Sequence, residues 1–185
     1  TPAQTVHNDE KIRIISVGTL YWIKNQLMTL RAISALHDMG YNVELTLLGD
    51  GEDREKIQNT IKASKAESYI FAPGSKKNVE DYLRQADIYV SASKTEGLPL
   101  SILEAMACGL PIVATDAGGT KDIVQTCVNG FLIGIDDEEE LKNALRRLVD
   151  DKALRMRCSR MSREIAESWN AENCTLGYEA LYSSL

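Results

Sequence analysis

Two glutamates and one lysine are the residues of this sequence whose types and spacing most suggest chemistry. Glu96 and Glu104 are separated by seven residues, in a stretch that passes from a polar loop into a predicted helix. A carboxylate accepts two hydrogen bonds, so each glutamate could hold a pair of sugar hydroxyls. Lys24 follows a different predicted strand and offers a point charge to a phosphate. The three residues together suit a ligand with an anion in its middle and hydroxyls at both ends.

The start of a helix between the two glutamates supplies the expected anion site. Pro99 is predicted to open a helix that runs to about Ala107 and that Gly109 closes, as proline and glycine often do at helix ends. The first N–H groups of a helix have no partner inside it and attract anions. The amides expected to face the anion are those of Gly97, Leu98, Leu100 and Ser101. A diphosphate bound there would lie between the two carboxylates.

Alternating strands and helices must position these residues. Strands are expected at 11–18, 43–48, 69–71, 88–90, 111–114 and 131–133, and helices at 25–39, 52–66, 79–85, 99–107, 120–125, 136–149, 153–168 and 172–185. The strands are nearly continuous apolar runs, which is typical of a parallel sheet with both faces covered. Pro73-Gly74 is expected to end the third strand. We therefore predict an α/β fold with a doubly wound, six-stranded parallel sheet and a helical C-terminal tail.

The two loops that carry the candidate residues are expected to meet at one edge of this sheet. Gly18 to Lys24 follows the first strand, and Ser91 to Pro99 follows the fourth. These strands are neighbours in the usual strand order, and ligands bind where that order reverses. Lys24 should therefore face Glu96 across one crevice. Gly118-Gly119 either turns the chain or lines the site, and Asp50 is expected to be a turn residue.

Composition and charge limit the classes of function. The 185 residues are enough for one domain, and 44% are apolar and 26% charged, as in ordinary globular proteins. The net charge of −6 argues against nucleic acid as a main partner. Residues 1–10 are polar and are expected to form a leader or linker, whereas residues 11–185 should form one domain. The four cysteines, at 108, 127, 158 and 174, are too far apart for a zinc site or disulfide framework and indicate reduced thiols in a cytoplasmic protein.

Several short motifs occur in the order found in one large enzyme family. They are Ser-Val-Gly-Thr-Leu at 16–20 with Lys24-Asn25, Leu-Leu-Gly-Asp-Gly at 47–51, Ala-Asp-Ile-Tyr-Val-Ser at 86–91, the paired glutamates at 96 and 104, Gly-Leu-Pro-Ile-Val-Ala-Thr-Asp-Ala-Gly-Gly at 109–119 and Asn-Gly-Phe-Leu-Ile at 129–133. As a set, these motifs resemble the retaining glycosyltransferases of family four, which have the GT-B fold. The match is to the C-terminal, Rossmann-like half that binds the donor.

The resemblance implies a role for each candidate residue. Glu104 would hold the ribose hydroxyls of a nucleotide-diphosphate sugar with UDP or GDP as carrier, and Glu96 would hold the sugar. Lys24 would bind the diphosphate together with the amides near Leu100, and Glu96 and Lys24 would be the catalytic residues. Gly18 and Thr19 would line the donor site, and residues 71–74 would lie near the base. Family members move a hexosyl unit to a glycan or lipid-linked acceptor with retained anomeric configuration, and they need no metal or other cofactor.

The sequence departs from the family pattern in two ways. Thr19 stands where the family usually has an arginine that pairs with the lysine on the diphosphate. The acceptor-binding N-terminal domain has no counterpart in this chain. We therefore expect a donor half that binds its nucleotide-sugar weakly and transfers little when alone.

Two other functions and one surface feature stay open at this point. A nicotinamide or flavin oxidoreductase is disfavoured because the first strand does not lead into Gly-x-Gly-x-x-Gly. A non-catalytic interaction domain is the second alternative, and Thr19 is its best support. Residues 142–163 contain eight basic and two acidic side chains, which indicates a solvated face, a face toward the acidic body, or a peripheral contact with an anionic membrane.

Overall fold

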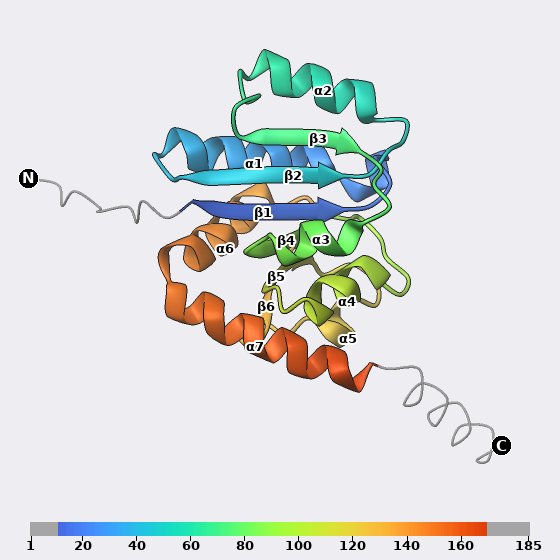
Figure 1. Cartoon of the computed structure of the whole chain (residues 1–185), viewed down its shortest axis with the longest axis vertical. Helices are drawn as coiled ribbons and strands as arrows, with labels where there is room; N and C mark the ends of the chain where they lie inside the picture. The colour runs from blue at the N-terminus through green and yellow to red at the C-terminus, as the bar shows by residue number, and fades with distance from the viewer. Residues whose placement is uncertain (1–10, 170–185) are drawn as a thin grey trace, which may run out of the picture.

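A parallel sheet of six strands forms the centre of the molecule (Figure 1). In this computed structural model, which describes residues 11–169, the strand order is β3-β2-β1-β4-β5-β6 and every neighbouring pair is parallel. The strands are β1 (Ile12–Val17), β2 (Val43–Leu48), β3 (Ile70–Gly74), β4 (Ile88–Ser91), β5 (Ile112–Thr115) and β6 (Gly130–Ile133). The order reverses between β1 and β4, so the predicted doubly wound sheet is confirmed.

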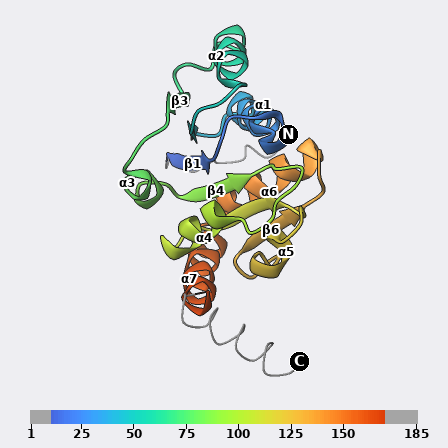
Figure 2. The same ribbon diagram turned by 90° about the vertical axis from the view of Figure 1, so that its right-hand side faces the viewer.

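Helices cover both faces of the sheet (Figures 1 and 2). They are η1 (Trp22–Lys24), α1 (Gln26–Asp38), α2 (Arg54–Ala63), α3 (Val79–Arg84), α4 (Leu100–Ala107), α5 (Thr120–Ile123), α6 (Glu138–Asp150) and α7 (Lys152–Ser168). Helices α1, α2 and α6 pack on one face, and α3, α4 and α5 pack on the other. Helix α7 contributes to both clusters, through Leu154 and Cys158 on one side and Ile165 on the other.

The continuous apolar runs are explained by burial of both faces. In β4, Ile88 and Val90 join the cluster under α1 and α6, whereas Tyr89 between them joins the cluster under α4. In β5, Val113 and Ile112 divide in the same way. Successive side chains of a strand point to opposite faces, so a strand covered on both sides needs apolar residues at every position.

The ends of several elements differ from the sequence prediction. β3 continues through Pro73 to Gly74, so the expected break at Pro73-Gly74 was wrong. Proline is tolerated there because β3 is an edge strand, where a missing N–H breaks no ladder inside the sheet. η1 was not predicted, and α4 begins at Leu100 because Pro99 forms its cap. The predicted helix 172–185 and the leader 1–10 lie outside the described residues.

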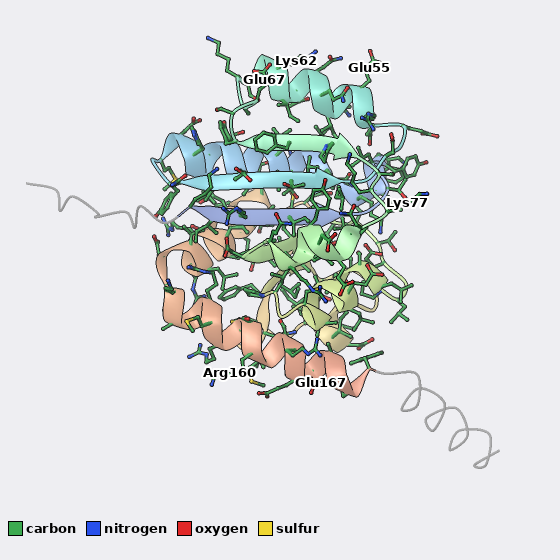
Figure 3. The ribbon with its side chains drawn as sticks, viewed as in Figure 1. Glu55, Lys62, Glu67, Lys77, Arg160 and Glu167 are labelled. Carbon is green, nitrogen blue, oxygen red and sulfur yellow. The ribbon has the colours of Figure 1, made fainter. Side chains whose placement is uncertain are left out.

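Part of the basic run is buried in helix contacts. Arg155 is only 7% exposed, and its Nη1 donates to the carbonyl oxygens of Leu148 at 2.7 Å and Val149 at 3.3 Å, near the end of α6. Arg163 donates in the same manner to the carbonyl oxygen of Ala107, at the end of α4. A cation at these helix ends favours the helix dipole and satisfies carbonyls that have no partner in the helix. The expectation of a solvated or body-facing basic surface was therefore wrong for Arg155, which lies inside the molecule, whereas Arg160 points outward (Figure 3).

Candidate functional site

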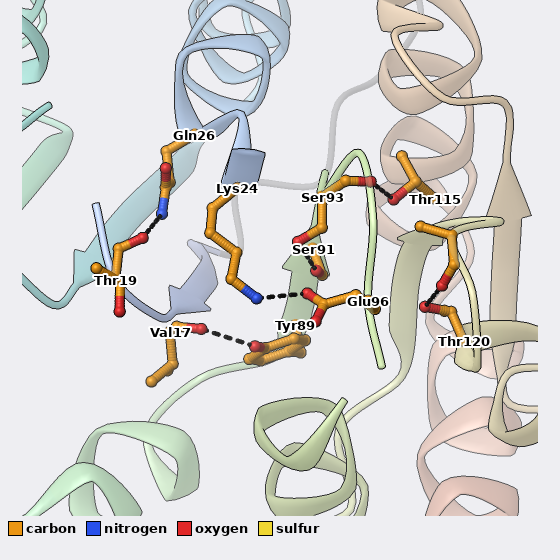
Figure 4. Close-up of polar contacts among 11 residues, drawn as sticks. Val17, Thr19, Lys24, Gln26, Tyr89, Ser91, Ser93, Glu96, Thr115 and Thr120 are labelled. Carbon is orange, nitrogen blue, oxygen red and sulfur yellow. Dashed lines mark hydrogen bonds and ion pairs between the residues drawn. The ribbon is translucent and has the colours of Figure 1, made fainter. Parts of the chain in front are cut away.

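The two candidate loops meet in one ion pair. Lys24 Nζ lies 2.7 Å from Glu96 Oε1, and the two side chains are 28% and 11% exposed (Figure 4). The backbone N–H of Lys94 also donates to the carbonyl oxygen of Ile23 at 2.7 Å. The prediction that Lys24 faces Glu96 is confirmed. The charge of Lys24 is already neutralised, so an anion that binds here must compete with Glu96.

The loop after β1 is closed by its own side chains. Gln26 is 5% exposed, and its Nε2 donates to the carbonyl oxygen of Thr19 at 2.9 Å (Figure 4). Thr19 itself is exposed and lies apart from the Lys24–Glu96 pair in this view. The stem of Lys24 passes over Gly18, because a Cβ built on Gly18 would lie 4.0 Å from Lys24 Cε. Gly18 therefore leaves room for the lysine, and Lys24 is the side chain of this loop that reaches the second loop.

Two glycines of the β2–α2 loop support the loop after β1. A Cβ on Gly49 would lie 1.9 Å from the carbonyl oxygen of Gly18, and a Cβ on Gly51 would lie 2.3 Å from that of Leu20. Asp50 between them accepts from the Leu20 N–H through its backbone, at 2.9 Å. The carboxylate of Asp50 accepts from Gly51 N at 2.9 Å and from Arg54 at 2.6 Å. Asp50 is thus a turn residue, as expected.

Gly118 and Gly119 support the loop that carries Glu96. A Cβ on Gly118 would lie 1.8 Å from the carbonyl oxygen of Glu96, and a Cβ on Gly119 would lie 2.5 Å from that of Gly97. The same loop is tied to β5, because the Thr115 hydroxyl donates to the carbonyl oxygen of Ser93 (Figure 4). The two glycines therefore do more than turn the chain: their lack of side chains lets two backbones touch directly under Glu96.

The start of α4 offers fewer free amides than the sequence suggested. The N–H of Leu100 donates to the carbonyl oxygen of Leu98 at 2.9 Å, so the prediction that this amide faces an anion was wrong in this state. Pro99 adopts φ −80° and ψ 75°, which folds the chain back over this short bond. The Leu98 and Leu100 side chains are 57% and 62% exposed, and this apolar rim beside Glu96 was not foreseen from the sequence.

Tyr89 connects the floor of the site to both glutamates. Its ring is fully buried, and its hydroxyl donates to the carbonyl oxygen of Val17 at 3.2 Å and shares a hydrogen bond with the Ser101 side chain (Figure 4). Burial raises the pKa of the Tyr89 phenol well above its ordinary value, and the negative charges of Glu96 and Glu104 add to the rise. Both carboxylates therefore lie within electrostatic reach of one phenol, although they have different neighbours.

Glu104 is exposed and lines a cavity of about 820 Å³ between α3 and α4. Lys77, Asn78 and Val79 form the wall at the start of α3, and Cys108 and Arg163 lie on the side of α4 and α7. Figure 3 shows Lys77 at the edge where the strands end. A ligand that reaches from the ion pair to Glu104 would run along the first two turns of α4.

Residues 77–79 were missed by the sequence reasoning, which placed the base near residues 71–74. Residues 71–73 instead line a separate cavity of about 420 Å³ beside α2, together with Ile61 and Lys62. The available signal was that residues 75–78 connect β3 to α3 and so cross the carboxyl ends of the central strands. The structure favours residues 77–79 as the wall that faces Glu104.

Two further expectations concern what the described residues do not contain. No group of three or more His, Cys, Asp and Glu side chains within residues 11–169 is arranged to hold a metal ion. That no metal takes part in the function stays a prediction. Over the same range, no helix is both long and apolar enough to cross a membrane.

Comparison with known proteins places the chain in a family. Residues 1–165 match the sequence profile described as glycosyl transferases group 1. The chain belongs to this family. It is 35% identical over 165 residues to an uncharacterized glycosyltransferase of Haemophilus influenzae, covering 88% of the chain and 46% of that protein. It is 28% identical over 157 residues to the UDP-Gal:alpha-D-GlcNAc-diphosphoundecaprenol alpha-1,3-galactosyltransferase of Escherichia coli, covering 83% of the chain and 41% of that protein.

Solved structures show the same fold. A crystal structure of a Staphylococcus aureus TarM mutant superposes with a TM-score of 0.85 at 22% identity, over 95% of the chain and 36% of that chain. The glycosyl transferases group 1 domain described here therefore has the Rossmann-like fold of the C-terminal half of GT-B proteins. The chain spans less than half the length of these two curated relatives and of TarM.

Replacing Tyr89 with Phe tests the floor of the site. At neutral pH the variant should lose about 1–3 kcal/mol of unfolding free energy, because Val17 and Ser101 lose a buried partner. The folded-state pKa of Tyr89 is raised, so above pH 10 the unfolded state releases its proton first and wild-type stability falls as pH rises. Urea unfolding from about pH 8 to about pH 11 should therefore show the gap between wild type and variant narrowing. Tyr21→Phe, at an exposed tyrosine, is the control, and a gap that does not change with pH would contradict the assignment.

Replacing Gly118 with Ala tests the contact under Glu96. Gly118 has φ +56° and no room for a Cβ, whereas Gly109 has φ +78° and its nearest listed neighbours would lie 3.6 Å and 3.8 Å from a Cβ. Both Ala variants carry left-handed strain, worth roughly 1–2 kcal/mol, but only Gly118→Ala must also move the Glu96 loop. Thermal unfolding should give a Tm several degrees lower for Gly118→Ala than for Gly109→Ala. Equal Tm values would show that the loop yields freely.

Proposed function

We propose that this domain binds the donor of a retaining glycosyltransferase that moves a hexosyl unit from a nucleotide-diphosphate sugar to a glycan or lipid-linked acceptor. The observation that carries the proposal is the Lys24–Glu96 pair at the point where the strand order reverses, with Glu104 farther along α4. Family membership supports sugar transfer in general. The donor, the acceptor and the retention of configuration are parts of the proposal.

The proposed roles follow from charge and position. When a donor binds, Lys24 exchanges its contact with Glu96 for the diphosphate, and Glu96 becomes available to the hydroxyls of the sugar. Glu104 accepts hydrogen bonds from the ribose in the cavity between α3 and α4. Negative charge develops on the diphosphate as the sugar leaves, and Lys24 stabilises it. No metal ion is part of the proposal.

Thr19 leaves the diphosphate with one lysine from this loop. Its side chain is exposed and uncharged, and its carbonyl oxygen is used by Gln26. The loss of one charge-assisted hydrogen bond costs about 1.5–3 kcal/mol, so weak donor binding is part of the proposal. A non-catalytic interaction domain is the alternative that Thr19 favours, and the titration described below separates the two.

UDP is the first carrier to test. The name of the E. coli relative specifies UDP-Gal, and the TarM mutant structure contains UDP. GDP remains the alternative carrier. Because the chain spans less than half of these proteins, we propose that the acceptor is bound by another domain and that the chain alone transfers little.

A cytoplasmic location is also proposed, on the ground that the three cysteines among the described residues, Cys108, Cys127 and Cys158, are all free thiols. Peripheral contact with an anionic membrane is proposed through the exposed Arg157 and Arg160 of α7. Sedimentation with anionic vesicles, with neutral vesicles as the control, would test this contact.

Calorimetric titration with UDP, GDP and NAD tests the donor role. The wild-type chain should bind one of the two nucleoside diphosphates but not NAD. Glu104→Ala should weaken that binding roughly ten-fold or more, because the ribose loses a charged acceptor, and should leave Tm unchanged because Glu104 is exposed. Binding of NAD alone would overturn the proposal. A folded chain that binds none of the three would support the interaction domain instead.

Glu96→Gln should separate recognition of the diphosphate from recognition of the sugar. The substitution removes the negative partner of Lys24, so UDP without a sugar should bind as tightly as before or up to about five-fold more tightly. The extra affinity of a UDP-sugar over UDP should shrink, because a carboxylate acceptor is lost. Glu138→Gln, which breaks the exposed pair with Arg31, is the control. A large loss of UDP affinity in Glu96→Gln would contradict the exchange of partners.

A further inference from the structure

Asp136 connects the two loops that carry Lys24 and Glu96. Both of its carboxylate oxygens accept from Lys94 Nζ, each at 2.5 Å, and Oδ1 also accepts from Asn25 Nδ2 at 2.9 Å. Asn25 directly follows Lys24, and Lys94 precedes Glu96 by two residues. One side chain from a third loop thus contacts both segments whose ends form the ion pair.

The fold explains how a residue after β6 reaches a residue after β1. β6 is an edge strand, and β4 and β5 separate it from β1. Helices α1 and α6, however, pack on the same face of the sheet (Figure 2), and Arg31 of α1 pairs with Glu138 of α6 at 2.7 Å. The start of α6 therefore lies beside the start of α1, where Asn25 is located.

The backbone at both ends of the Asn25–Asp136 contact is strained. Asn25 has φ 50° and Asp136 has φ 61°, values that residues other than glycine rarely adopt. Such residues persist where their surroundings fix them, and they gather at functional sites. Of the other described non-glycine residues with positive φ, Lys65 follows α2 and Cys127 precedes β6, and neither belongs to the loops of the site.

A structural role for Asp136 in starting α6 is excluded by its neighbour. Asp137 is the cap of α6, because its Oδ1 accepts from Glu140 N at 2.8 Å. Glu140 Oε2 in turn accepts from Gly134 N at 2.7 Å. The helix start is satisfied by these two side chains, and the carboxylate of Asp136 is left to the loops.

We propose that Asp136 is a positioning residue that holds the turn at residues 23–25 against the loop at residues 94–96 and so sets Lys24 against Glu96. Asp136 is 55% exposed, so its pair with Lys94 contributes little to global stability. Its effect is on the placement of the loops before a ligand arrives, which reduces the ordering that binding requires. The effect on ligand affinity rests on the proposed donor function, whereas the effect on Lys24 itself does not.

Asp136→Gly removes the carboxylate and relieves the backbone strain at once, because glycine readily adopts positive φ. Lys65→Gly makes the same backbone change at φ 54°, away from the site, and is the matched control. Neither variant should have a lower Tm than wild type. Asp136→Gly should raise the UDP dissociation constant about three- to ten-fold, and Lys65→Gly should leave it unchanged. Lys94→Met, which removes the partner on the other loop, should reproduce the loss.

A readout without ligand separates this proposal from the donor function. A short pulse of acetic anhydride followed by mass spectrometry measures the reactivity of the Lys24 amine. Reactivity should rise in Asp136→Gly and stay at the wild-type level in Lys65→Gly. If no chain binds UDP but Lys24 reactivity rises in Asp136→Gly, the donor function fails and the positioning role stands. Wild-type reactivity of Lys24 in Asp136→Gly, or a Tm several degrees below that of Lys65→Gly, would overturn the positioning role.

Discussion

The ion pair between Lys24 and Glu96 depends on backbones that touch without side chains between them. Gly49 and Gly51 lie under the loop of the lysine, and Gly118 and Gly119 lie under the loop of the glutamate. A single methyl group at Gly49, Gly51, Gly118 or Gly119 would overlap a carbonyl oxygen of the loop above. The site is therefore built from four loops in direct contact, and two of them contribute shape and no charge.

The described domain satisfies its own charges at this site before any ligand binds. Lys24 is paired with Glu96, Lys94 with Asp136, and the Leu100 amide with the carbonyl oxygen of Leu98. Binding of an anion is then an exchange of partners, and its free energy is the difference between two similar interactions. Selectivity can be high in such a site while affinity stays modest, because a ligand must replace every contact that it breaks.

The sequence was sufficient for the sheet and for the meeting of Lys24 with Glu96. Continuous apolar runs and their alternation with helices are local signals, and right-handed connections leave few strand orders. Features that depend on packing between distant elements were not accessible. Pro73 lies within a strand only because β3 is at the edge of the sheet, and Arg155 is buried only because α7 folds back along α6. The neighbours of Glu104 likewise depend on where α3 is placed against α4.

The contact of Arg163 with the last carbonyl group of α4 bears on where this evolutionary unit ends. Helix α4 begins beside Glu96 and carries Glu104, so a residue that fixes its far end also fixes the axis along which the two carboxylates are arrayed. The region that matches the family profile extends to residue 165, just past this arginine. The inherited module therefore includes the most distant described side chain that grips α4, and a gene fusion or truncation that cut before it would separate the helix from its anchor.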